Sequence, residues 1–545
     1  MAAARTSVLA LASLALAAVA FGGERGEFAA YIVRFKPEPG AAQVKPLMQA
    51  LASEVEGLSE RPAARRQEGL AQRRRSTIAR SAGLVQSMAT RQNAHRGVRL
   101  LWLVGGVQVR CTPELAEELR ARPDVEKVEL DPFLSVALPR PTAPRVSTSA
   151  GAWQLNMIRA TGVREELGLT GKGVTVGLLD TGIVDAGPLA GRIAAYRDFT
   201  SKPAPTPTDP LGHGTAVASV LAGARTSEGC GVAPGCKLVV ARVLEELELT
   251  GTAAANRKVV GAFAGQIVQA MQWMLDPDGD PSTDDAPRIV NNSWGFSNPE
   301  LLSADYFRPA VDAWTHAGIL PVFSAGNTVD EATKHTFFPA SYEQVLAVGS
   351  VGLDRSWSPF SAVGRSTEGR AKPDLVAPGA SVLAWNASGY ASFDGTSFAA
   401  PQVAAVGALL LEAWPELTRQ ELFELLTSTA VDLGEPGPDR LHGAGLLQAE
   451  SASAALMAKA ESKLVSSQSL EAFLAALEAL LGRAGEQPFA VRLAARAAER
   501  FAAALPPRQR EQLASLPRAA FPAAKPYLLA QLSRPSVPTA RAAAR

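Results

Sequence analysis

Four polar residues, spread over the middle of the chain, could together carry out acyl transfer. They are Asp180, His213, Asn327 and Ser397. A serine becomes a nucleophile when a histidine accepts its proton, and a carboxylate that holds the imidazole completes the set. An amide side chain can donate a hydrogen bond to the oxygen that becomes negative when a carbonyl is attacked. The chain thus offers one residue for each role, provided that the fold brings them together.

The surroundings of Ser397 suit a nucleophile but also have a simpler explanation. Ser397 opens a run of small and apolar residues that predicts a buried helix. In the first turn of a helix the backbone N–H groups lack partners and carry the positive end of the helix dipole, which favours a developing negative charge. Serine is also a common helix cap, so this position alone favours a structural role. The partners decide between the two.

The other three residues are predicted at strand ends and at a helix start. Asp180 follows an apolar run at 174–179, and Asn327 follows one at 319–324. His213 begins a helix of small residues, and no His or Glu stands beside it at a metal-binding spacing. The sequence Asp-Thr-Gly also occurs in aspartic proteases, but these need two such motifs whose carboxylates share a proton. This chain has no second Asp-Thr-Gly.

The elements that must position these residues predict an α/β fold. From about 150 to 450, short apolar runs alternate with helical segments, which indicates a doubly wound, mostly parallel sheet covered on both faces. Residues 28–137 predict a small α+β domain, and 138–149, rich in Pro, Thr and Ser, an exposed linker. Residues 460–545 predict a helical extension with a disordered end.

Charge and the N-terminus bear on partners and location. The chain has 545 residues and a net charge of +1, so nucleic acid and anionic membranes are not expected partners. An Arg-rich stretch near 65–75 is interpreted as a solvated helix face. Residues 1–20 predict an export signal that is cleaved, with an uncleaved anchor as the alternative. No later run predicts a membrane span, so we expect the mature protein to be soluble and secreted, periplasmic or extracellular. We also expect a monomer.

The order of acid, base and nucleophile along the chain is that of the subtilisins. Three blocks resemble the signatures of the subtilisin-like serine proteases, the subtilase family: Asp180-Thr181-Gly182, His213-Gly214-Thr215, and Gly395-Thr396-Ser397 followed by Ala399-Ala400-Pro401. Segments 231–235, 324–327 and 372–379 match further recurrent family segments. The resemblance covers about 153–449, and 28–137 resembles the inhibitory propeptide of the family. The last hundred or so residues match nothing.

This resemblance implies a secreted serine endopeptidase made as a self-processed zymogen. Asp180, His213 and Ser397 form the triad, Asn327 supplies the oxyanion hole, and removal of the propeptide falls within 138–149. Protein or peptide substrates and the chain's own propeptide are the expected partners. The alternative is a catalytically silent binding protein on the same scaffold, which the loss of a triad residue would favour; none is lost. The extension could dock a partner, hold the protein at a surface, or be removed.

Two segments resemble the family's substrate-binding walls. Expected to line the cleft are Ser293, Trp294, Gly295, Ser324, Ala325 and Gly326. The first three match the segment that pairs with substrate backbone, although Trp294 could equally be a packing residue. The apolar lining favours hydrophobic over basic substrate side chains.

The chemistry needs no cofactor, but a structural calcium ion and a disulfide are expectations to test. The loop 276–285 is rich in carboxylates, and Asp276, Asp278 and Asp280 alternate in a way that suits Ca²⁺. A solvated acidic loop is the alternative. Cys230 and Cys236 bracket a short loop. If the propeptide is removed, Cys111 leaves with it, and these two are the cysteines that remain. They predict a disulfide in an oxidising compartment.

Overall fold

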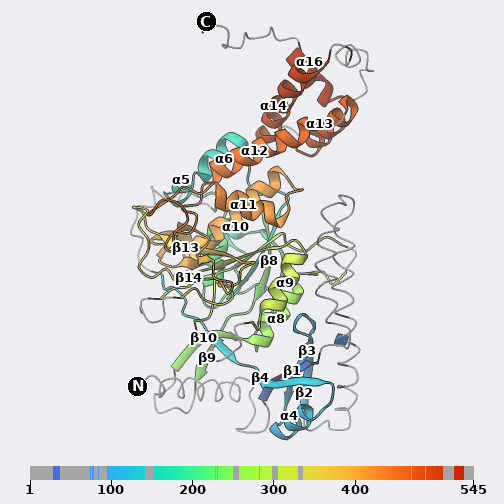
Figure 1. Cartoon of the computed structure of the whole chain (residues 1–545). Coiled ribbons are helices and arrows are strands. Elements are labelled where there is room, and N and C mark those ends of the chain that lie inside the picture. Colours follow the sequence, from blue (N-terminus) through green and yellow to red (C-terminus); the bar gives the residue numbers. More distant parts are fainter. Residues whose placement is uncertain are drawn as a thin grey trace.

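The computed structural model (Figure 1) describes most of the chain. The described residues are 29–36, 74, 77–78, 81, 84, 95–141, 153–226, 229, 231–249, 257–280, 283–297, 305–328, 335–467, 469–484, 487–506, 508 and 521–532. The predicted export signal, nearly all of the Arg-rich stretch, Cys230, most of the predicted processing linker and the predicted disordered end lie outside these residues.

A central sheet of seven strands runs through the middle of the chain, in the order β16-β13-β12-β11-β6-β8-β7. All of its neighbouring strands are parallel. Its strands are β6 (Thr175–Asp180), β7 (Ile193–Asp198), β8 (Lys237–Arg242), β11 (Ile289–Asn292), β12 (Leu320–Ser324), β13 (Leu346–Val351) and β16 (Leu375–Pro378). The predicted fold class, a mostly parallel sheet in an α/β domain, is confirmed.

The sheet is buried on both faces because alternate residues of each strand belong to different hydrophobic clusters. Leu178 and Val322 pack with helices α7 (His213–Ala222) and α10 (Thr396–Ala413). Their neighbours Leu179 and Phe323 pack with α8 (Ala264–Trp273) and α9 (Arg308–His316). Side chains alternate between the two faces of a strand, so near-continuous apolar runs are what such a sheet requires.

Helix α10 is the central helix of one face. By length and composition it could cross a membrane, but 94% of it is buried inside the protein, as is usual for the core helix of a globular domain. The remaining elements of this domain are α5 (Trp153–Met157), α6 (Ala160–Leu167), a 3-10 turn (Gly187–Leu189), β14 (Gly364–Arg365), β15 (Ala371–Lys372), β17 (Val382–Trp385), β18 (Tyr390–Phe393) and α11 (Arg419–Ser428).

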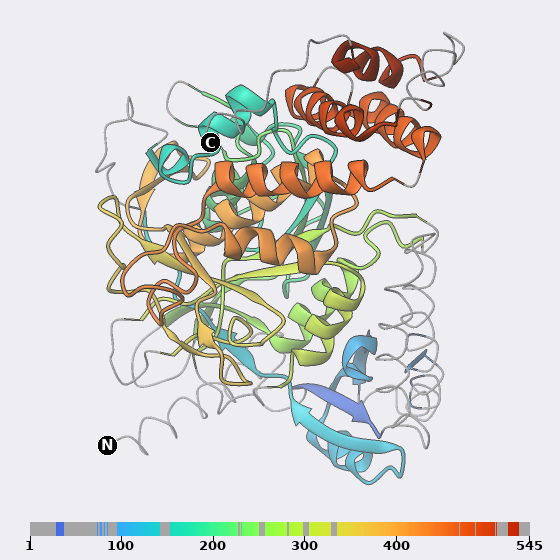
Figure 2. The ribbon, with the colours of Figure 1, turned by 45° about the horizontal axis from the view of Figure 1, so that its top comes forward.

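The N-terminal unit forms a separate antiparallel sheet at one end of the molecule (Figure 2). Its strands, in the order β2-β3-β1-β4, are β1 (Ala29–Phe35), β2 (His95–Leu101), β3 (Gly106–Cys111) and β4 (Val125–Leu130), with helix α4 (Pro113–Arg120). Thr112 caps α4 by accepting a hydrogen bond from the Leu115 N–H. A 3-10 turn of this unit (Trp102–Val104) packs against α8 and α9 of the larger domain.

A small sheet that the sequence did not predict links the N-terminal unit to the larger domain. It has the order β5-β10-β9 and consists of β5 (Phe133–Ser135), β9 (Glu245–Leu249) and β10 (Arg257–Phe263). Strand β5 directly follows the N-terminal unit, whereas β9 and β10 form a hairpin of the larger domain. The hairpin therefore holds the segment that leaves the N-terminal unit.

The predicted C-terminal helices are confirmed and lie at the opposite end from the N-terminal unit (Figure 1). They are α12 (Ala449–Val465), α13 (Leu470–Ala484), α14 (Pro488–Ala504) and α16 (Ala524–Leu532). Their apolar residues join the cluster that contains α7 and α10. Helix α12 crosses the boundary predicted between 450 and 460, so the extension is continuous with the core of the larger domain.

Candidate active site

The carboxyl ends of the parallel strands bring the predicted acid and base together. Asp180, the last residue of β6, is fully buried, and His213, the first residue of α7, is nearly so. The Nδ1 of His213 lies 2.6 Å from Oδ1 of Asp180, which also accepts a hydrogen bond of 2.7 Å from the Thr181 N–H. This contact fixes the ring so that Nε2 is the nitrogen left for chemistry.

A second carboxylate, which the sequence analysis missed, supports this pair. Asp209 accepts hydrogen bonds from the hydroxyls of Thr181 and Thr215, each at 2.7 Å, and from the backbone N–H groups of Gly212 and Thr215 at 2.9 and 2.8 Å. It therefore ties the end of β6 to the start of α7. An acid four residues before His213 at a helix start was the only signal in the sequence.

The electrostatics of His213 favour a strong base. Burial by itself lowers the pKa of the imidazole, but the Asp180 carboxylate in contact with it and the more distant Asp209 carboxylate raise the pKa, and the net shift is upward. A buried imidazolium between two carboxylates is thus stabilised. Within the described part of the chain, Nε2 of His213 has no hydrogen-bond partner.

Ser397 lies beside this histidine at the start of α10. The rings of His213 and Phe398 are 5.8 Å apart, which places the histidine next to the residue that follows Ser397. The Ser397 hydroxyl donates to the carbonyl of Ser293 at 3.1 Å, and the Ser293 hydroxyl donates to the carbonyl of Ser397 at 2.7 Å. In this conformation the hydroxyl must turn to reach Nε2, and loose geometry of this kind is common in unliganded sites.

Asn327 is oriented by Thr396, the residue before Ser397. Its amide oxygen accepts hydrogen bonds from the backbone N–H and the hydroxyl of Thr396, both at 2.9 Å. The oxygen is thereby fully occupied, and the NH₂ group turns toward Gly395: a Cβ atom built there would lie 3.4 Å from Nδ2. An amide donor beside the serine backbone N–H is the arrangement that can bind an oxyanion.

The predicted substrate walls are buried beside the serine. Trp294 packs on Phe296 and Phe323 and belongs to the cluster of α8 and α9, so it is a packing residue, and its role as a wall stays a prediction. Phe337, which sequence reasoning missed, packs against both glycines of the walls. A Cβ atom on Gly326 would lie 2.5 Å from Cγ of Phe337, and one on Gly295 would lie 2.9 Å from its Cβ. Its ring thus fills space that the two glycines leave.

The chain's own segment after β5 crosses this site. The Val136 N–H donates to the carbonyl of Val260 in β10 at 2.8 Å, and Leu138 packs on the cluster that contains Trp294. Farther on, a Cβ atom built on Gly395 would lie 2.6 Å from Cγ of Pro139. Residues 133–139 therefore run as an extended segment from the hairpin to the edge of the nucleophile helix.

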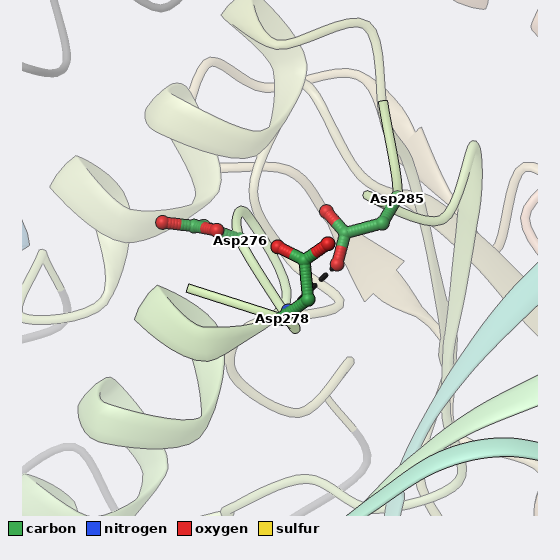
Figure 3. A group of neighbouring side chains, drawn as sticks. All are labelled: Asp276, Asp278 and Asp285. Atoms are coloured by element: carbon green, nitrogen blue, oxygen red, sulfur yellow. Dashed lines mark hydrogen bonds between the residues drawn. The ribbon is translucent and has the colours of Figure 1, made fainter. Parts of the chain in front are cut away.

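The acidic loop brings together a different trio from the one predicted. Asp276, Asp278 and Asp285 offer oxygens that all lie within 4.8 Å of one another (Figure 3). The side chain of the predicted third ligand, Asp280, is exposed and outside this group, while its N–H donates to Asp278 at 2.8 Å. Asp285 joins Asp276 and Asp278 in this group, and Asp280 as a ligand stays a prediction.

The loop also touches the Arg-rich stretch. Arg74 lies 3.5 Å from the Asp276 carboxylate. Burial raises the pKa values of Asp276 and Asp285, and the negative charge of Asp278 acts in the same direction on both. Arg74 lowers the pKa of Asp276, and the hydrogen bond from the Asp278 N–H lowers that of Asp285. Three close carboxylates have the hard oxygen donors that Ca²⁺ takes, so the residues fit this ion.

Of the two cysteines predicted to pair, only Cys236 lies within the described residues. It is fully buried and carries a free thiol, and burial raises its pKa to about 12. Because Cys230 lies outside the described residues, the disulfide between the two stays a prediction for an oxidising compartment.

Comparison with known proteins gives a consistent set of similarities. The family model described as "Subtilase family" matches residues 171–445 of this chain. Bacillopeptidase F of Bacillus subtilis (strain 168) is 30% identical over 403 residues, which cover 67% of this chain and 27% of that protein. Alkaline elastase YaB of Bacillus sp. (strain YaB) is 33% identical, over 62% of this chain and 79% of its own. Subtilisin DY of Bacillus licheniformis is 32% identical, over 54% of this chain and 96% of its own length. The chain thus spans only about a quarter of bacillopeptidase F.

Proposed function

The chain belongs to the subtilase family of serine endopeptidases, and from this premise we propose that it hydrolyses peptide bonds with Asp180, His213 and Ser397. The single observation that carries the proposal is the buried contact of 2.6 Å between Asp180 and His213, next to the serine helix. A silent scaffold would not need a buried carboxylate to hold a histidine whose second nitrogen has no partner in the described part of the chain.

The mechanism follows from the geometry of these side chains. The Ser397 hydroxyl turns away from the Ser293 carbonyl, gives its proton to Nε2 of His213 and attacks the substrate carbonyl. Asp180 holds the ring through Nδ1 and stabilises the imidazolium. The proton then passes to the leaving amine, and a water molecule, deprotonated by His213, releases the acyl group from Ser397.

The oxyanion of this reaction would lie between Asn327 and the start of α10. The Asn327 NH₂ group and the backbone N–H of Ser397 are the two donors. Because Thr396 holds the Asn327 oxygen, the donor is oriented before the charge develops, which is when such a donor is most effective.

Substrates are proposed to bind as extended strands, in the place now taken by residues 133–139. This segment would leave after cleavage within 138–149, and the N-terminal unit would act until then as inhibitor and folding template. Hydrogen bonds to the edge of β10 provide the pairing. Since Phe337 fills the space beside Gly295 and Gly326, we propose that the residue before the cleaved bond is small and apolar.

Secretion and calcium binding belong to the same proposal. Export would be directed by residues 1–20. A calcium ion would be structural only, held by Asp276, Asp278 and Asp285. Melting temperatures with Ca²⁺ and with a chelator test this: the ion is expected to raise the value for the wild type but not for Asp278→Asn.

The test of the main proposal is the processing of a serine variant. Ser397→Ala removes the nucleophile, so the full chain is expected to accumulate uncut, whereas the wild type shortens and reacts with a fluorophosphonate probe. Mass measurement of both purified proteins gives the result. If the purified variant is still cut at the same site, self-cleavage is ruled out. A wild type that never reacts with the probe would contradict the protease assignment.

A further inference from the structure

Strand β5, which leads into the segment that reaches the nucleophile helix, presents side chains to two different surfaces. In the pairing of β5 with β10, Phe133 stands opposite Phe263 and Leu134 opposite Ala262. Successive residues of a strand point to opposite faces, and the structure follows this rule. Leu134 joins the cluster that contains Trp294 and the core of α8, on the side of the predicted substrate walls. Phe133 points the other way.

Phe133 enters a separate apolar site on the β9–β10 hairpin. Only 2% of the Phe133 side chain is exposed, and its ring meets Phe263 edge to face, with centroids 5.2 Å apart and planes at 71°. Leu247 of β9 and Val259 of β10, which are paired across the hairpin, pack against these two rings. The four side chains form a small cluster of their own, distinct from the two clusters of the central sheet.

A glycine makes room for the aromatic ring in this site. Gly261 lies between Val259 and Phe263 on the same face of β10. A Cβ atom built on Gly261 would lie 2.8 Å from Cε1 of Phe133 and 2.2 Å from the carbonyl oxygen of Leu134. Any larger residue would push both the ring and the strand away. The charged residues Glu246, Glu248 and Lys258 occupy the alternate positions of the hairpin and so the opposite face.

We propose that the hairpin carries an additional substrate subsite, formed by Gly261, Phe263, Leu247 and Val259, that selects an aromatic side chain in the bound substrate strand. The inference rests on the proposed function, because Phe133 must leave with the N-terminal unit before a substrate can enter. A substrate strand that pairs with β10 in the same register places one side chain in the cluster that contains Trp294 and the preceding one in this site. An aromatic ring there gains both burial and an edge-to-face contact.

A competition between two peptides tests the subsite. One peptide has the sequence of residues 132–149, and the other has Ser in place of Phe at the position of Phe133. Both are mixed with the processed wild-type enzyme, and cleavage is followed by mass spectrometry. We expect kcat/KM to favour the Phe peptide about tenfold, the usual effect of an aromatic contact of this kind. Equal cleavage of the two peptides overturns the proposal.

Matched variants of the hairpin connect the selectivity to this face. The double variant Leu247→Ser, Val259→Ser is expected to reduce the preference to less than about threefold. Glu248→Gln, on the opposite face of the same strand, is expected to keep it. A double variant that retains the tenfold preference contradicts the proposal, as does a Glu248→Gln enzyme that loses it.

A second measurement needs no catalysis. In the uncut Ser397→Ala chain, the Val136 amide is bonded to the Val260 carbonyl, and its hydrogen exchange reports how firmly the strand is held. Phe133→Ser, or the double variant with Phe133 intact, is expected to accelerate this exchange about tenfold, and Glu248→Gln is not. Unchanged exchange in both overturns the subsite. If the wild type cleaves neither peptide, the protease assignment fails, while this measurement still decides the subsite.

Discussion

At the scale of single residues, the site depends on side chains that hold other side chains in place. Thr396 fixes the amide of Asn327, and Asp180 fixes the ring of His213. The acid, the base, the serine and the asparagine could be predicted from the sequence because each stands at the end of an apolar run or at the start of a helix. Thr396 and Phe337 could not, because their roles depend on which distant residues they contact in the folded chain.

Removal of the proposed oxyanion donor should slow the chemical step. For Asn327→Ala we expect kcat to fall about a hundred- to a thousandfold with little change in KM, since the donor acts on charge that develops only in the transition state. Steady-state kinetics on one peptide give both constants. Thr396→Val, which loses only the hydroxyl that orients Asn327, should show a smaller loss of kcat. An unchanged kcat in Asn327→Ala would exclude this residue from the oxyanion hole.

Shortening of Phe337 should change which bonds are cut. Phe337→Ala leaves free space beside Gly295 and Gly326, so the enzyme is expected to accept Phe or Leu before the cleaved bond, with kcat/KM for such peptides rising at least about tenfold. A peptide library that varies this position measures the preference. Phe296→Leu, in the packed cluster of Trp294, serves as the control. A wild type that already prefers large residues would refute the role of Phe337.

At the scale of elements, the start of α7 is braced to the end of β6 by a carboxylate. Asp209 accepts hydrogen bonds from both elements, so it couples the position of the base to that of the acid. The sequence predicted both elements but not this link, because an acidic residue in a loop has many possible partners until the loop is folded. The β9–β10 hairpin was missed for a similar reason: its short strands pair with a segment far away in the chain.

Replacement of this carboxylate should shift the pH dependence of catalysis. The base must be neutral to accept the serine proton, so kcat/KM rises as the pH increases through the pKa of His213. Asp209 is one of the charges that raise this pKa. Asp209→Asn is therefore expected to move the acid limb of the pH profile of kcat/KM to lower pH. The exposed Asp185 is the control, and Asp185→Asn should leave the limb where it is. A limb that moves upward in Asp209→Asn would contradict this electrostatic role.

At the scale of the whole molecule, the N-terminal unit and the larger domain meet at a buried carboxylate. Asp131 follows β4, accepts a hydrogen bond of 3.0 Å from the N–H of Gly265 in the first turn of α8, and accepts another from Gln108. Burial raises its pKa to about 7, even though these hydrogen bonds and Arg99 act in the opposite direction. The contact between the two units is therefore linked to protonation.

The sign of this linkage gives a prediction for the zymogen. A carboxyl whose pKa is raised by docking binds more protons when docked, so docking is most favourable at low pH and weakens as the pH rises toward about 7. In uncut Ser397→Ala, protection of the Gly265 amide, corrected for its intrinsic exchange rate, should fall by up to about tenfold per pH unit between pH 5 and 7. Asp131→Asn should show flat protection. Protection that rises with pH would reverse the proposed sign.

The sequence by itself determined the chemistry, the order of the site residues and the class of the fold. Apolar runs and helix starts are local signals, and they place Asp180, His213, Asn327 and Ser397 without knowledge of their neighbours. Only the tertiary structure decided the contacts between distant segments: Asp209 with Thr181, Phe337 with Gly295 and Gly326, and Phe133 with Phe263 in the hairpin. These contacts depend on close packing of backbone and side chains that lie far apart in the chain, and no local pattern encodes them.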